Sequence, residues 1–227
     1  ETLNPLNIVV FVGAGLGLIA AVVFMNEASR NITVHYARRV KEGGSSGSQV
    51  THLPLRLNQA GVIPIIFAIS LVLLPSLAAQ LLEKVGNPVV ATAARNVATF
   101  MNPNQFAYNF IYFVLVVAFT YFYTAVVFNP EKIADEMKKY GGFVPGIRPG
   151  IATTEYLTTV LNRITLVGAF FLGGLAVLPA VAQAAFQIPT LSLGGTGILI
   201  VVSVVLETTK SLQSQLLLRS YDKFLGV

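Results

Sequence analysis

The residues that could carry chemistry are few, and they avoid the apolar runs of the chain. The 227 residues include 10 Asp and Glu, 15 Lys and Arg, two His and no Cys. Without cysteine, thiol nucleophiles, disulfides and zinc-thiolate sites are excluded. His35 and His52 fall in one polar loop, where solvated imidazoles are expected rather than metal ligands. The sequence contains no HExxH, no GxSxG and no paired aspartates inside an apolar run. It therefore favours passage of a substrate over catalysis and indicates no enzyme, no cofactor and no metal.

A proton pathway is also not indicated. Glu207 and Lys210 stand three residues apart near the end of an apolar run, which is typical of an ordinary helix-end pair rather than of a relay carboxylate. Ion-coupled transporters normally carry ionisable groups or an unwound, carbonyl-lined helix at the midplane. Half of an inverted-repeat secondary transporter remains the alternative, since such folds also use five-helix units.

The elements that must position these residues are membrane-spanning helices. Hydrophobic residues make up 54% of the chain, charged residues 11%, and the mean hydropathy is +0.71, which indicates an all-α polytopic membrane protein. A span needs about 20 apolar residues. Five runs meet this condition, at 8–25, 62–82, 106–128, 160–182 and 192–212.

The first run has neither a basic segment before it nor a small-residue cleavage motif after it, so we do not expect it to be a signal peptide. Because the chain begins with Glu1 rather than methionine, only a few residues before this run, we expect it to be a portion of something longer.

The basic residues predict the orientation of the five spans. Of the 15 Lys and Arg, only Lys84 and Arg95 fall on one side, and the other thirteen fall on the opposite side. The positive-inside rule therefore places the loops 26–60 and 129–159 and the tail 213–227 in the cytoplasm, with the N-terminus external.

The long loops carry recognisable local structure. In the first, a strand-like stretch at 32–37, a Gly/Ser tip at 43–47 and a second extended piece predict a projecting β-hairpin. Asn129-Pro130 opens a short amphipathic helix in the second loop, and Gly141-Gly142 ends it before the rigid tip FVPGIRPG. On the external side, the segment 87–104 is expected to form an interfacial helix.

Five blocks of sequence resemble the C-terminal half of the SecY family, the channel subunit of the bacterial protein translocase. They are HLPLRLNQAGVIPIIF (52–67), YARR (36–39), GGFVPGIRPG (141–150), RITLVG (163–168) and GGTGILIVV (194–202). They occur in the family's order and spacing over essentially the whole chain. The resemblance implies that residues 1–227 are one five-helix half, the family's transmembrane helices 6 to 10, of an inverted-repeat clamshell. It also implies a protein-conducting channel of the bacterial inner membrane, which passes unfolded preproteins and releases hydrophobic segments into the bilayer.

The resemblance assigns pore and gate residues. Ile63, Ile66 and Ile200 match the family's hydrophobic pore ring, while Pro64 and Ser70 lie in the helix that forms one side of the lateral gate, where a signal sequence intercalates. Bulky aliphatic side chains around a narrow waist repel water and ions. The alternatives are ordinary apolar helix residues for the isoleucines, and for Ser70 a hydroxyl bonded to its own helix backbone.

The resemblance also implies docking sites and partners. Arg148 matches an arginine needed to engage the SecA motor, and Arg38 with Arg39 match a basic tip that contacts the ribosome, although topology alone also requires basic cytoplasmic loops. The further partners implied are SecE, SecG and the N-terminal half of the channel. Without that half, we expect the chain to be inactive and to self-associate, as a symmetric dimer through the face that the other half would cover.

Overall fold

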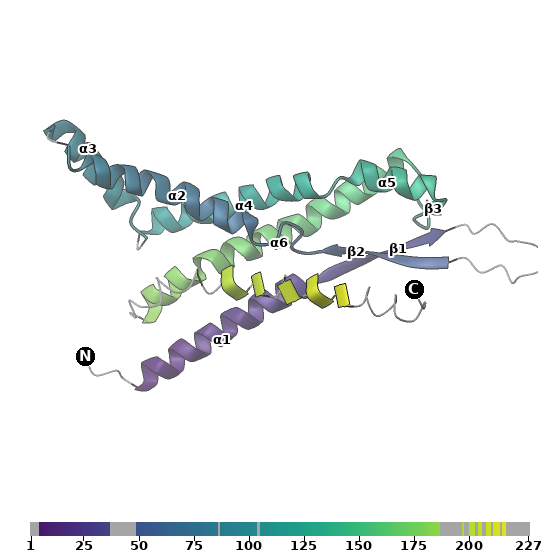
Figure 1. The fold of residues 1–227 in the computed structure, drawn as a ribbon, viewed down its shortest axis with the longest axis horizontal. Coiled ribbons are helices and arrows are strands. Elements are labelled where there is room, and N and C mark those ends of the chain that lie inside the picture. Colours follow the sequence, from purple (N-terminus) through teal and green to yellow (C-terminus); the bar gives the residue numbers. More distant parts are fainter. Residues whose placement is uncertain are drawn as a thin grey trace, which may run out of the picture.

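The computed structural model describes residues 5–36, 49–85, 87–103 and 105–186, together with separate helical residues between 197 and 216. Long helices form an elongated bundle, and a small sheet lies at one end of it (Figure 1). The predicted run 192–212 and the tail 213–227 are therefore described only in part, and residues 37–48 lie outside the described residues.

Four long helices make the bundle: α1 Pro5–Glu27, α2 Ile63–Leu82, α4 Phe106–Val127 and α6 Ile151–Phe186. Each overlaps one of the predicted apolar runs closely, except that α6 begins at Ile151, well before the run at 160–182. Among the described residues, three helical stretches are long and apolar enough to cross a membrane, Ile63–Leu82, Phe106–Lys139 and Ile151–Val181, and Gly15–Glu27 is a shorter apolar helix.

The long helices share one apolar core, which we call the bundle cluster. Every long helix contributes to it, and its centre includes side chains with no exposure to solvent. Its buried members are Leu18, Val22, Met25, Ile65, Ala68, Val72, Tyr108, Tyr112, Val116, Leu172, Leu175 and Ala176.

Two short helices begin in the same way. Helix α3 Pro88–Phe100 is capped by Asn87, whose side-chain oxygen accepts a hydrogen bond from Val89 N, and α5 Pro130–Lys139 is capped by Asn129, which accepts from Lys132 N. In each case a proline at the first helical position follows the cap, where its missing N–H is not needed.

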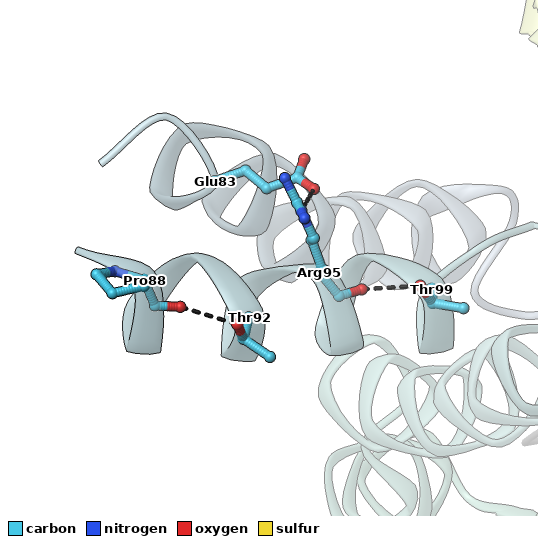
Figure 2. A network of polar contacts seen from close by, with 5 residues as sticks. All are labelled: Glu83, Pro88, Thr92, Arg95 and Thr99. Atoms are coloured by element: carbon cyan, nitrogen blue, oxygen red, sulfur yellow. Dashed lines mark hydrogen bonds and ion pairs between the residues drawn. The ribbon is translucent and has the colours of Figure 1, made fainter. Parts of the chain in front are cut away.

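Helix α3 folds back on the end of α2 and is fixed there by an ion pair. Arg95 Nε donates to Glu83 Oε1 at 3.1 Å, joining the middle of α3 to the turn that follows α2 (Figure 2). The hydroxyls of Thr92 and Thr99 donate to backbone carbonyls of α3 itself. These contacts lie along one side of the helix, which we call the polar stripe of α3.

Three strands form the sheet at the other end of the molecule: β1 Ser29–Tyr36, β2 Gln49–Arg56 and β3 Gly142–Phe143, in the order β2-β1-β3. Strand β1 pairs antiparallel with β2 from Ser29↔Arg56 to Tyr36↔Gln49. Pro54 is tolerated because β2 is an edge strand in this sheet. The hairpin was predicted, whereas its third strand was not.

The sheet, α5 and the first turns of α6 pack into a second core, the head cluster. Its buried residues are Ile32, Val34, Leu55, Ala134, Met137, Val144, Leu157 and Val160. The sequence predicted a hairpin, a short helix and a rigid tip but not that they pack on one another. Because they do, the two basic loops form one folded unit, which we call the head.

Candidate functional site

The start of α2 is tied to the end of α1. Asn58 Nδ2 donates to Asn26 Oδ1 and to the carbonyl of Gly61, both at 3.1 Å, and Leu57 N donates to the carbonyl of Ala28 at 2.8 Å. Gly61 adopts a φ of 65°, which lets the chain turn into the helix. These bonds fix the position from which α2 enters the bundle.

The predicted ring residues lie on the open face of α2. Ile63 and Ile66 are 43% and 39% exposed, whereas Pro64 and Ile65 between them are buried against the bundle. A spacing of three puts the two isoleucines on one face of the helix. Ile200 is a half-buried helical residue of a separate segment. Its meeting with Ile63 and Ile66 around a pore stays a prediction.

Of the two predicted gate residues, Pro64 stands at the first turn of α2, where a proline removes no helical hydrogen bond. Ser70 is exposed, and its hydroxyl donates to the carbonyl of Ile66 at 2.7 Å. The hydroxyl of Ser70 is therefore bonded to its own helix, which is the alternative given above for this residue. A role for either residue in a gate stays a prediction. Pro75 further along α2 interrupts the backbone hydrogen bonds of the helix.

Arg148 lies at an exposed tip of the head. The tip is bounded by Gly146 with a φ of 81° and Gly150 with a φ of 107°, conformations that favour glycine. Thr153 Oγ1 donates to the carbonyl of Arg148 at 2.9 Å and holds the tip against the start of α6. The tip therefore presents its arginine on a rigid support. Arg38 and Arg39 lie outside the described residues.

Gly168 is a structural residue that the sequence analysis did not single out. A Cβ on Gly168 would collide with the carbonyl oxygen of Leu57, because α6 passes directly behind the segment that leads into α2. The Asn26–Asn58 contact was also missed. Its only signal in the sequence is Asn58, in the polar stretch just before the apolar run. Nothing in the sequence indicates that its partner lies 32 residues away.

Long apolar helices around one core, with a compact head at one end, define an all-α polytopic membrane protein. The particular family follows from comparison. A family model described as SecY matches residues 1–209, so the chain belongs to the SecY family.

Curated relatives agree with this family. The protein translocase subunit SecY of Mycobacterium tuberculosis (strain ATCC 25618 / H37Rv) is 46% identical over 218 residues, covering 93% of this chain and 49% of that protein. The same subunit of Streptomyces coelicolor is 46% identical over 212 residues, covering 93% and 48%.

Two similar structures show the fold alone. One, of a protein-conducting channel, aligns with a TM-score of 0.54 at 16% identity over 89% of this chain and 48% of that one. The other, concerning the SecY plug domain and the closed state of the channel, aligns with a TM-score of 0.58 at 17% identity over 89% and 49%. The chain spans about half the length of the curated relatives it matches.

Proposed function

We propose that this chain serves as one half of a protein-conducting channel, which passes unfolded preproteins across a membrane and releases hydrophobic segments into it. The observation that carries the proposal is that α2, in a chain of the SecY family, has one buried face and one exposed apolar face. Pro64 and Ile65 anchor the helix in the bundle, and Ile63 and Ile66 are left open. Such a helix supplies apolar side chains to a seal while remaining attached to its own half.

The proposed setting is the bacterial inner membrane, with the head in the cytoplasm and the N-terminus outside. The excess of basic residues on the side of the head supports this orientation. Arg148, and Arg38 with Arg39, are then placed to meet SecA and the ribosome, while SecE and SecG would complete the assembly. In this proposal the chain conducts and its partners supply the energy.

The test is complementation in cells depleted of their own channel. This chain is co-expressed with a matching N-terminal half from a close relative, and secretion of a signal-bearing reporter is measured. Restored secretion with both halves, and none with either alone, is expected. Failure of the pair to restore secretion, with both halves present in the membrane, would contradict the proposal, and uptake of a small solute in its place would favour the transporter alternative.

The isolated chain is proposed to self-associate through the open face of α2. Exposed Leu73, Leu74 and Leu77 extend the apolar surface of Ile63 and Ile66. Native mass measurement in detergent is expected to show dimers, and monomers alone at every concentration would exclude them.

Helix α3 offers a separate test of the orientation. Its apolar stripe, Val89, Ala93, Val97 and Phe100, is exposed and, by helical spacing, lies beside the polar stripe. Arg95 of the polar stripe pairs with Glu83 (Figure 2). Since Glu83 follows the end of the span, the polar stripe is expected to face water and the apolar stripe lipid.

The chain has no tryptophan, so the fluorescence of a single introduced tryptophan can be measured without background from other tryptophans. In vesicles, Val97→Trp is expected to be quenched by brominated acyl chains, and the matched Thr92→Trp by aqueous iodide. Equal access of iodide to both positions would show that α3 does not lie in the interface.

A further inference from the structure

The junction between α1 and α2 contains a buried amide that joins two segments far apart in the sequence. Asn58 is 8% exposed and lies in the short stretch that leads from β2 into α2. Its Nδ2 donates to Asn26 Oδ1 in the last turn of α1 and to the carbonyl of Gly61, both at 3.1 Å. One side chain therefore holds the end of one long helix and the turn that begins the next.

The bonds of Asn58 come directly after the paired strands of the hairpin. The bond from Leu57 N to the carbonyl of Ala28, at 2.8 Å, continues the pairing of β1 with β2 beyond the last residues of both strands. Asn58 and Asn26 then meet through their side chains, where the two segments become helices. Figure 1 shows that α1 and α2 diverge from this junction. The junction is thus a place where the position of α2 relative to α1 can be fixed.

The direction of the Asn58 amide follows from its partners. A carbonyl oxygen can only accept, so the side-chain nitrogen must face Gly61 and the side-chain oxygen must point the other way. There Oδ1 is buried and has no hydrogen-bond partner within the part of the chain that the structure describes. An unpaired buried oxygen lowers the stability of the folded state. An asparagine at this position is therefore explained by the bonds of its nitrogen and not by its oxygen.

The alternative is an ordinary turn asparagine whose side chain bonds a nearby carbonyl. The bond to Gly61, three residues further on, is of this local kind. The bond to Asn26 is not, because its partner lies 32 residues away on another helix. The turn is also buried, since Ala60 and Val62 are 4% and 5% exposed. Asn58 thus links two helices inside the packed molecule.

The turn held by Asn58 determines where the exposed apolar face of α2 begins. Gly61 stands two residues before Ile63 and five before Ile66. The helix begins at Ile63, and no side chain caps it at Val62. Because a helix is stiff over its first turns, a shift of the turn along the helix axis moves both isoleucines by the same amount.

We propose that Asn58 is a positioning residue for the exposed apolar face of α2. By joining Asn26 of α1 to the turn at Gly61, it sets the depth at which Ile63 and Ile66 lie relative to α1. The importance of that depth for a pore seal rests on the proposed function, whereas the position of α2 is a property of this chain alone.

The test measures the position of α2 in the full chain purified in detergent. The chain has no cysteine, so spin labels can be attached at Leu16→Cys in α1 and Leu81→Cys in α2, both exposed positions. Pulsed electron spin resonance then gives the distance between the labels, and the parent is expected to show one narrow distribution. Asn58→Leu keeps the size of the side chain but removes its donor. It is expected to shift or widen the distribution by about 1.5 Å or more, the rise of one helical residue.

Asn109→Leu is the matched control. Asn109 Nδ2 also donates to two carbonyls, those of Pro103 and Gln105 at 2.9 and 3.1 Å, but these belong to the start of α4 and the loop before it. This variant is expected to keep the distance of the parent, even where it lowers the unfolding temperature as much as Asn58→Leu does. An unchanged distance in Asn58→Leu, or an equal change in both variants, would overturn the proposal.

Asn26→Ala is the second variant and keeps the test decisive if Asn58→Leu does not fold. It removes the acceptor on α1 and leaves the bond from Asn58 to Gly61 in place. It is expected to change the distance in the same sense, and a folded Asn26→Ala chain with the distance of the parent would overturn the proposal.

The complete channel, made from two co-expressed halves, separates this inference from the proposed function. Asn58→Leu is expected to increase ion flux in the absence of preprotein, because the isoleucines of α2 no longer lie at the depth of the ring. A changed distance with unchanged flux would support the positioning role of Asn58 and count against the ring.

Discussion

Replacing Gly168 with alanine is expected to lower the stability of the chain by about 1–3 kcal/mol, the usual cost of forcing an extra carbon into a packed interior. The added Cβ would meet the carbonyl oxygen of Leu57, which belongs to the backbone and cannot rotate away. Leu57 is itself held by the bond from its N–H to Ala28, so relief requires α6 to move away from the segment before α2. Thermal unfolding in detergent, followed by loss of helical signal, measures the effect.

Gly174 in the same helix provides the matched control. A Cβ there would meet nothing within 4 Å. Because alanine favours helix over glycine by roughly 0.5–1 kcal/mol, Gly174→Ala is expected to leave the unfolding temperature unchanged or to raise it. Equal behaviour of the two variants would mean that α6 and Leu57 are not in close contact.

Glycine at both Ile66 and Ile200 is expected to make the complete channel leak small ions. The two changes remove the side chains that would narrow the waist and keep it dry, while the open face of α2 stays otherwise intact. Ion flux through vesicles containing the two co-expressed halves, without preprotein, measures the leak.

Leu77→Gly is the control for this pair. Leu77 lies on the same face of α2, is also exposed, and stands about 16 Å further along the helix axis than Ile66. Each glycine costs about 1 kcal/mol of helix stability, so a general loosening of α2 would appear in both variants. A leak confined to the Ile66 and Ile200 changes supports a ring at one depth. A flux no greater than that of the parent channel would show the ring assignment to be wrong.

The sequence predicted the long elements well because their cause is local. A run of about 20 apolar residues can satisfy its backbone in lipid only as a helix, and α1, α2 and α4 follow the predicted runs closely. Helix α6 begins at Ile151, before the predicted apolar run 160–182, because residues 151–159 are too polar to be counted in such a run. They are helical, and Leu157 from this part is fully buried in the head cluster.

The parts of the site that could be predicted from the sequence are those that depend on residue type and local spacing. Helical spacing places Ile63 and Ile66 on one face without any structure, and the caps at Asn87 and Asn129 follow from an asparagine before a proline. Contacts between distant segments have no such local signal. The contact of Gly168 with Leu57 emerges only when α6 and the loop before α2 are placed side by side.

Helix α6 also has a mechanical consequence. It runs without interruption for 36 residues, roughly 54 Å at 1.5 Å per residue. Leu157 near its beginning belongs to the head cluster, and Leu172 and Leu175 belong to the bundle cluster. A force on the tip at Arg148 is therefore transmitted along one continuous helix, which is packed among the long helices at its other end. A tilt of the head is expected to tilt α6 within the bundle.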